Sequence, residues 1–139
     1  MMIVETTADV RYAETDQMGV VYHANYLVWC EIGRTALLDA LGYRYADLEK
    51  EEILSPVTSL EMNYKHPAKY GETVTIKTRV EAYTGVRVTY SYEIVNEKGD
   101  SCLEGTSTHA LVKKGSFKPV SMKRVNLEMH EAYLRAIGK

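Results

Sequence analysis

Cysteine is scarce in this chain of 139 residues, which contains only Cys30 and Cys102. Domains that depend on disulfides carry several cysteines at short spacing, whereas these two lie far apart in a sequence that is 45% hydrophobic and 26% charged. The scarcity excludes a disulfide scaffold. We therefore expect both thiols to be reduced residues of an ordinary globular core.

Long hydrophobic runs are also missing. No uninterrupted apolar stretch approaches the ~18 residues that a transmembrane helix needs. The first residues, M-M-I-V-E-T-T, lack the basic flank and the apolar run of a signal peptide. We expect a cytoplasmic protein without an integral membrane segment.

Several recognition motifs are absent as well. The formal net charge is −2 and no block of Lys and Arg appears, so no nucleic-acid partner is expected. The sequence has no G-x-S-x-G elbow, no P-loop and no G-x-G-x-x-G turn. His66, His109 and His130 show neither ligand spacing nor a nearby cysteine pair. We therefore expect no metal site and no cofactor.

Alternation of apolar and polar residues is the main pattern that the chain does contain. It runs from Val4 to Tyr12 and predicts a half-buried strand over about residues 3–12. Further alternating segments predict strands between about residues 55 and 114. The turns at Thr84-Gly85 and Lys98-Gly99 are short enough for hairpins, so the sheet should be mostly antiparallel.

Helical spacing marks a long segment over about residues 24–41. Asn25 is the predicted N-cap, and Gly42 is a natural residue to end the helix. Gly33 lies in its middle, where glycine costs roughly 1 kcal/mol relative to alanine, so we expect close approach to another element. The predicted buried stripe consists of Tyr26, Trp29, Cys30, Gly33, Leu37, Ala40 and Leu41.

These elements must share one core. A second helical segment is predicted at about residues 126–137, and no repeat or linker interrupts the chain, so residues 1–139 should form a single domain. One long helix and about five strands predict an α+β fold. In this fold, a curved antiparallel sheet wraps around the central helix.

The start of the long helix has the chemistry of an acyl-transfer site. Its first N–H groups have no partner within the helix and favour negative charge, which suits the oxyanion of a tetrahedral intermediate. Asp16 reaches the same end through a short turn at Gly19. A carboxylate beside an oxyanion site is the minimum equipment for cleaving an activated acyl group.

The run from Tyr12 to Trp29, Y-A-E-T-D-Q-M-G-V-V-Y-H-A-N-Y-L-V-W, resembles the signature of the hydroxybenzoyl-CoA thioesterase family of hotdog-fold acyl-CoA thioesterases. It is most similar to the small bacterial branch associated with the Tol–Pal envelope cluster. The later segment Y-K-H-P-A-K-Y-G-E is also similar to the family. The resemblance implies a hotdog fold and an acyl-CoA substrate.

The resemblance also assigns roles to single residues. It implies that Asp16 is catalytic as general base or nucleophile, that His23 acts on the thioester carbonyl or on bound water, and that Tyr12 orients Asp16. Tyr22 and Asn25 are predicted substrate contacts at the helix start. Tyr12 remains open to a second interpretation as ordinary strand core, and Asp16 to one as a turn residue.

Assembly is the other implication. Open sheet edges are liabilities unless they are paired or covered, and hotdog relatives pair their sheets side by side. We expect a homodimer or homotetramer in which Thr58 and Ser59 complete the partner's site. Lys65, Lys69 and Arg87 are equal candidates for contact with the carrier phosphates.

Other functions stay open at this point. A hotdog hydratase or dehydratase also pairs a histidine with a carboxylate, and a non-catalytic module could bind acyl-CoA or acyl carrier protein. Glu31 is a reserve candidate for the base, although a surface pair with Arg34 is its simpler interpretation. The sequence leaves open the acyl length and the choice between CoA and acyl carrier protein.

Overall fold

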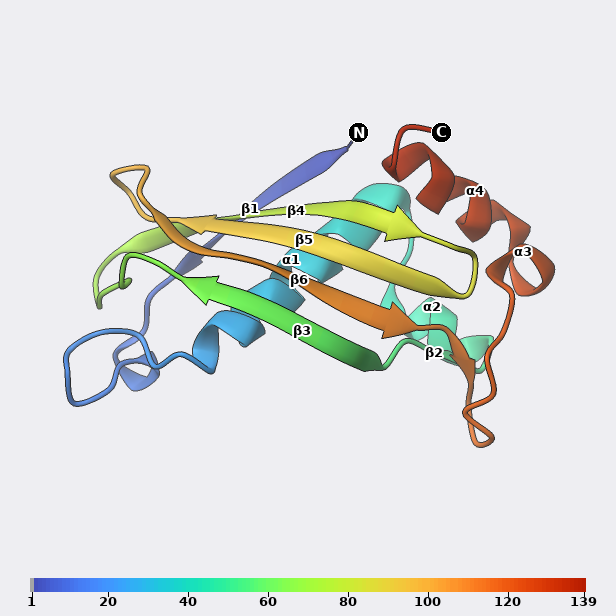
Figure 1. Cartoon of the computed structure of the whole chain (residues 1–139), viewed down its shortest axis with the longest axis horizontal. Helices are drawn as coiled ribbons and strands as arrows, with labels where there is room; N and C mark the ends of the chain where they lie inside the picture. The colour runs from blue at the N-terminus through green and yellow to red at the C-terminus, as the bar shows by residue number, and fades with distance from the viewer. Residues whose placement is uncertain (1) are drawn as a thin grey trace.

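The computed structural model describes residues 2–139, and within them a five-stranded antiparallel sheet lies across the long helix α1 (Figure 1). The strand order is β1-β4-β5-β6-β3. The predicted α+β hotdog fold is therefore confirmed. The elements of this layer pair are α1 (Asn25–Leu41), β1 (Ile3–Asp9), β3 (Val57–Tyr64), β4 (Thr73–Tyr83), β5 (Arg87–Val95) and β6 (Ser101–Ala110).

Smaller elements close the two ends of the sheet. A short antiparallel pair, β2 with β7, lies next to the start of β3, and two helices near the C-terminus cover the far end of β4 and β5 (Figure 1). No helix among residues 2–139 is long and apolar enough to cross a membrane. These elements are η1 (Tyr12–Glu14), α2 (Tyr45–Lys50), β2 (Ile53–Leu54), β7 (Val112–Lys113), α3 (Met122–Val125) and α4 (Leu127–Ala136).

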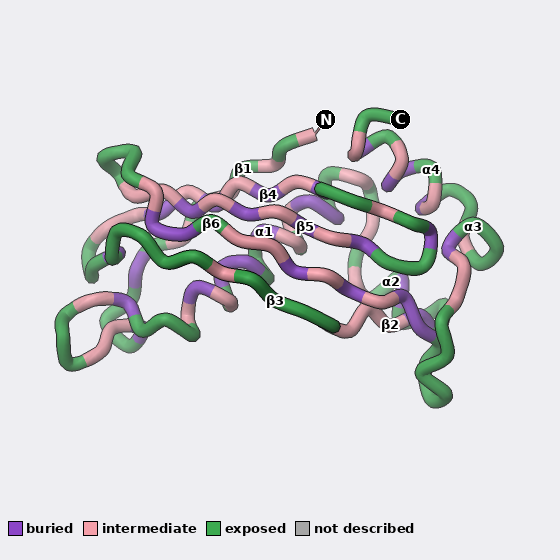
Figure 2. Tube along the Cα trace, in the orientation of Figure 1, coloured by how far each residue is buried: buried purple, intermediate pink, exposed green. Residues whose placement is uncertain are grey.

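Burial alternates along the central strands β4 and β5 (Figure 2). Every second side chain faces α1, as the period of two residues in a strand requires. The inner set includes Val74, Ile76, Tyr90 and Ile94, which are at most 2% exposed. This face forms the hydrophobic core with the buried stripe of α1.

Gly33 is the point of closest approach between α1 and the sheet. A Cβ atom added there would lie 2.8 Å from Ile76 Cγ2 and would also collide with Thr78 Oγ1. The expectation of close approach, drawn from a glycine in mid-helix, is confirmed. The cost of the glycine is offset because only a bare backbone can pack so closely on β4.

Other predicted details of α1 are wrong. Ala24 occupies the N-cap position, and no side-chain hydrogen bond caps the helix there. Asn25 is the first helical residue. The Asn25 side chain instead donates from Nδ2 to the carbonyl oxygen of Glu14 at 2.8 Å. Leu38 is buried where Ala40 was expected, because the helix faces the sheet with a slightly rotated stripe.

The predicted first strand is too long. It ends at Asp9, and Tyr12 lies in a 3₁₀ turn where it is 77% exposed, so its interpretation as strand core is wrong. The reason is Glu14, whose carboxylate accepts a hydrogen bond from Arg11 N–H at 2.8 Å and so closes the turn. A local side-chain bond of this kind competes with continued pairing to β4.

Strand β3 lies at one edge of the sheet, where within residues 2–139 it is hydrogen-bonded only to β6. Its apolar residues are unusually exposed: Val57 is 46%, Leu60 48% and Tyr64 46% accessible. Figure 2 shows most of this strand as exposed. An edge with apolar side chains and open backbone groups is suited to pairing with another chain.

Candidate active site

The loop that carries Asp16 is a closed and ordered turn. Thr15 and Val21 form an isolated antiparallel bridge, and Asp16 N–H donates to the Val20 carbonyl at 2.9 Å. Gly19 N–H donates back to the Asp16 carbonyl at 3.0 Å, with a left-handed φ of +81°. The turn predicted at Gly19 therefore presents Asp16 on a fixed backbone.

Only one oxygen of the Asp16 carboxylate is engaged. Oδ1 accepts a hydrogen bond from Met18 N–H at 2.8 Å, and the residue is half-buried. No donor among the described residues reaches Oδ2. The carboxylate is therefore oriented by one oxygen and available through the other, which is the arrangement that a general base or nucleophile needs.

Glu14 holds this loop against α1, and the sequence interpretation missed it. Its carbonyl oxygen accepts hydrogen bonds from Tyr22 N–H at 2.9 Å and from Asn25 Nδ2 at 2.8 Å. Its carboxylate is buried and also lies 3.4 Å from Arg11 Nε. The spacing of Glu14 three residues after Arg11 was the available signal. Asn25, predicted as a substrate contact, has an amide already engaged in this loop.

The start of α1 offers free donors. His23 and Ala24 come directly before the helix, and among the described residues their backbone N–H groups donate to no acceptor. The His23 side chain is exposed and packs against the ring of Tyr22, with 4.4 Å between centroids. Asp16 and His23 therefore lie at the same end of α1, but no hydrogen bond joins them within residues 2–139.

A series of aromatic rings leads from this surface into the core. Neighbouring rings meet at centroid distances of 6.2 Å for His23 with Tyr64, 5.4 Å for Tyr64 with Tyr26, and 5.1 Å for Tyr26 with Trp29. Tyr64 also donates from its hydroxyl to the His23 carbonyl at 3.1 Å. The site therefore combines polar groups at the rim with a partly exposed aromatic wall.

The two sequence motifs meet in space. Val21 N–H donates to the Ala68 carbonyl at 2.9 Å, and Ala68 N–H donates to the Tyr26 hydroxyl at 3.0 Å. Tyr12 and Tyr70 form an edge-to-face pair with 5.7 Å between centroids. The segment after β3 thus supports the Asp16 loop from one side. Tyr12 lies in this support and contacts Tyr70.

Thr58 and Ser59 lie elsewhere in the same chain. Thr58 donates to the Thr108 carbonyl at 3.1 Å near the start of β3, whereas Tyr64 and His23 meet at its end. Six residues of strand separate the two, which corresponds to about 20 Å. Within one chain, the structure does not bring these predicted substrate contacts to Asp16.

Glu31 does not form the predicted surface pair with Arg34 among the described residues. Glu31 is exposed on α1, while Arg34 turns towards the sheet and donates to the Tyr92 hydroxyl at 3.0 Å. The three-residue spacing that suggested a pair is also compatible with an arginine that reaches inward along its apolar stem. Glu31 is therefore without the basic partner expected for it.

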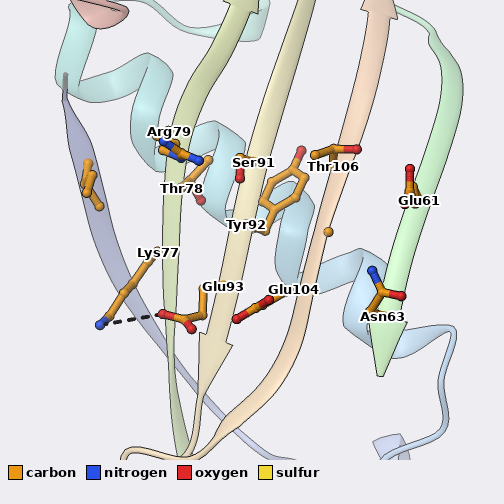
Figure 3. Close-up of a pocket in the computed structure, with 12 residues that line it drawn as sticks. Glu61, Asn63, Lys77, Thr78, Arg79, Ser91, Tyr92, Glu93, Glu104 and Thr106 are labelled. Carbon is orange, nitrogen blue, oxygen red and sulfur yellow. Dashed lines mark ion pairs between the residues drawn. The ribbon is translucent and has the colours of Figure 1, made fainter. Parts of the chain in front are cut away.

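A separate hollow of about 450 Å³ lies on the face of the sheet opposite α1 (Figure 3). Its charged lining includes Lys77 and Glu93, whose side chains approach to 4.0 Å, together with Glu61 and Glu104. None of the predicted site residues lines it. Among residues 2–139, no group of three His, Cys, Asp or Glu could hold a metal ion.

Comparisons with known proteins identify the family of this chain. A family model described as "Thioesterase superfamily" matches residues 18–103. A protein of Bacillus subtilis named as a candidate acyl-CoA thioesterase, YneP, is 48% identical over 98% of this chain and 99% of its own length. The acyl-CoA thioesterase YbgC of Haemophilus influenzae is 30% identical over 87% and 90%. A solved DHNA-CoA thioesterase from Staphylococcus aureus is 45% identical, with a TM-score of 0.94 over 97% of this chain and 91% of that one.

Proposed function

This chain belongs to the thioesterase superfamily and is an acyl-CoA thioester hydrolase, and we propose that it cleaves an aroyl-CoA at the Asp16 loop. The observation that carries this proposal is the joining of that loop to the start of α1 through Glu14. It brings a carboxylate with one unengaged oxygen to the same helix end as two unengaged N–H groups.

The reaction uses these groups in two ways. Oδ2 of Asp16 either takes a proton from water as the water attacks the thioester carbonyl, or attacks that carbon itself to give an anhydride that water then opens. The N–H groups of His23 and Ala24 stabilise the oxyanion, and the His23 imidazole positions water or polarises the carbonyl. The C–S bond breaks, and the products are a carboxylic acid and the free CoA thiol.

The aromatic wall supports the choice of an aromatic acyl group. Tyr22, His23 and Tyr64 expose ring surface beside the helix start, and flat rings pack on such surfaces in offset or edge-to-face geometry. The Staphylococcus aureus relative is named for an aromatic acyl-CoA. Membership of the hydroxybenzoyl-CoA branch associated with Tol–Pal remains a prediction, as do the cytoplasmic location and acyl carrier protein as an alternative carrier.

The site is completed by a second copy of the chain in this proposal. Antiparallel pairing of two β3 edges about a two-fold axis places the start of one β3 beside the end of the other. Thr58 and Ser59 of one chain would then lie near Tyr64 and His23 of the other, which resolves their separation of about 20 Å. The exposed apolar side chains of β3 would be covered by the same contact.

A panel of acyl-CoA thioesters with a thiol-reactive dye tests the function. We expect free CoA thiol to appear, with kcat/KM higher for benzoyl-CoA than for acetyl-CoA or octanoyl-CoA. A hydratase or a binding module would release no thiol from any member of the panel. Preference for the straight-chain substrates would remove the aromatic acyl group from the proposal while leaving hydrolysis intact.

A further inference from the structure

Residues 113–118 form a tight hairpin at the end of the molecule remote from the Asp16 loop (Figure 1). Lys113 N–H donates to the Lys118 carbonyl at 2.9 Å, and Phe117 N–H donates to the Lys113 carbonyl at 2.9 Å. Gly115 has a φ of +90° and Phe117 one of +54° at the tip. The backbone is thus held in one shape, with its side chains exposed.

The hairpin is strongly basic. It carries Lys113, Lys114 and Lys118, and no Asp or Glu occurs in the sequence between Glu104 and Glu128. Lys113 and Lys114 are adjacent, but three other residues precede Lys118, so the segment is not an unbroken basic block. Glu52 is joined to the hairpin through its backbone carbonyl, yet no ion pair within residues 2–139 involves a lysine of the hairpin.

Phe117 is the chain's single phenylalanine, and it is 58% exposed at the hairpin tip. A left-handed conformation is uncommon for a bulky residue, so the hairpin holds this ring outward at some conformational cost. Proteins that bind single-stranded nucleic acids combine exposed aromatic rings with basic groups, and one nucleotide can be held by the same two contacts. The ring stacks on the base while the ammonium groups contact phosphate oxygens.

The position of the hairpin relates it to the other chain's site. Lys114 N–H donates to the Glu52 carbonyl at 2.8 Å, and Ala110 N–H donates to the Pro56 carbonyl at 3.1 Å, so the hairpin is tied to the start of β3. Figure 1 shows the hairpin and the Asp16 loop at opposite ends of β3, both projecting past this edge. A two-fold axis through the β3 edge exchanges the ends and brings one chain's hairpin to the other chain's Asp16 loop.

We propose that this hairpin binds the 3′-phosphorylated ADP portion of CoA in the site of the paired chain. The three lysines contact the phosphates, and Phe117 stacks on the adenine. The inference rests on the proposed function and on β3 pairing. It also replaces an earlier candidate, since the Lys65 ammonium already lies 3.0 Å from Glu104.

Hydrolysis of a substrate with the CoA nucleotide and of one without it tests the contact between the hairpin and that nucleotide. For Lys114→Ala/Lys118→Ala, we expect KM for benzoyl-CoA to rise about tenfold with kcat nearly unchanged, since charged phosphate contacts are among the stronger hydrogen bonds. Phe117→Ala should raise KM by a smaller factor. The benzoyl thioester of N-acetylcysteamine lacks the nucleotide, so its kcat/KM should be the same for the variants and the wild type. Lys98→Ala, in the turn between β5 and β6, is the matched control.

Mixed dimers test whether the hairpin of one chain serves the Asp16 site of the other chain. An Asp16→Asn chain is combined with a Lys114→Ala/Lys118→Ala chain. The one site that retains Asp16 then faces the intact hairpin of the other chain, so this heterodimer should recover the low KM of the wild type. If the hairpin acted within its own chain, that site would keep the high KM.

Calorimetric measurement of the affinity for free CoA tests the hairpin site independently of the hydrolytic function on which the inference rests. The lysine variant should bind CoA about tenfold more weakly than the wild type, whether or not any thioester is hydrolysed. Unchanged CoA affinity, or an equal loss of kcat/KM on both thioesters, would overturn the hairpin site. Absence of thiol release from the wild type, with hairpin-dependent CoA binding, would overturn hydrolysis alone.

Discussion

Two sets of polar groups in this molecule differ in how completely they are satisfied. In the core, Arg34 donates to the Tyr92 hydroxyl, Tyr92 bonds to Ser107, and Ser107 Oγ lies 2.9 Å from His109 Nε2. His109 Nδ1 ends the series by donating to the Ser55 carbonyl at 3.1 Å. At the start of α1, by contrast, Asp16 Oδ2 and two N–H groups have no partner in the described chain.

This difference distinguishes the polar groups that stabilise the fold from those that can take part in the reaction. A carbonyl oxygen can only accept, so the bond to Ser55 places the His109 proton on Nδ1 and leaves Nε2 as an acceptor for Ser107. Each group in this series then donates once in the same direction, and Arg34 Nε is a buried atom of the series that has no hydrogen-bond partner among the described residues. Buried polar groups satisfied in this way specify a unique core, whereas groups left open at a surface are available to a ligand.

The largest expected effect is at Asp16. Asp16→Asn keeps the size of the side chain but removes its charge, so kcat should fall by roughly 10²-fold or more, in the range of acid–base catalysis. The melting temperature should stay close to that of the wild type, because the side chain contributes a single exposed turn bond. Thiol release and thermal melting of the same preparation check both parts. Near-normal turnover would transfer the role of base to Glu31.

His23→Ala should have a smaller effect on turnover. The variant keeps the backbone N–H at the helix start and loses only the imidazole, so we expect a decrease on the order of tenfold. The comparison of kcat between the two variants on benzoyl-CoA measures the order of the roles. A greater loss for His23→Ala than for Asp16→Asn would reverse them.

Gly33→Ala tests the packing of α1 on β4. The added methyl group collides with Thr78 and Ile76, so unfolding free energy should fall by about 1–3 kcal/mol. Denaturant titration at constant m-value measures the loss. Adding Thr78→Ala should recover part of the stability by removing Oγ1. If the single variant were as stable as the wild type, the approach of helix to sheet would be looser than described.

The smallest expected effect is a pH dependence of stability at His109. Burial lowers the pKa of its imidazole below the ordinary value, while Arg34, Ser107, Tyr90 and the Ser55 carbonyl face it. The unfolded state then binds more protons, so stability should fall as the pH drops below about 6.5 towards the lowered pKa. Above that range His109 adds no slope. Melting curves of the wild type and His109→Gln from pH 5 to 8 should diverge only at the acidic end.

Local chemistry decided which features were predictable from the sequence. Gly33 signalled close packing because a glycine inside a helix needs a reason, and Asp16 and Gly19 signalled a turn because few residues adopt its backbone angles. Arg34 was misplaced because spacing along a helix cannot distinguish a surface pair from a stem that reaches inward.

Other features depend on contacts between distant segments. Glu14 supports the site through its own carbonyl oxygen, whereas its spacing from Arg11 indicates only the local turn. Thr58 and Ser59 were assigned to the site by resemblance, yet only a second chain could bring them there. The lysine hairpin is a short basic segment in the sequence, and the bond between Lys113 and Lys118 brings its two ends together in the fold.

The most direct test of the account pairs one variant from each polar set. Ser107→Ala removes the acceptor of the Tyr92 hydroxyl proton and the donor to His109 Nε2, while the bond from Arg34 to Tyr92 stays, and the loss should lower stability by about 1–3 kcal/mol. Measured side by side, Ser107→Ala should lose melting temperature and keep kcat on benzoyl-CoA, while Asp16→Asn should lose kcat and keep melting temperature. Loss of both quantities in both variants, or the reverse assignment, would contradict the separation of structure from chemistry.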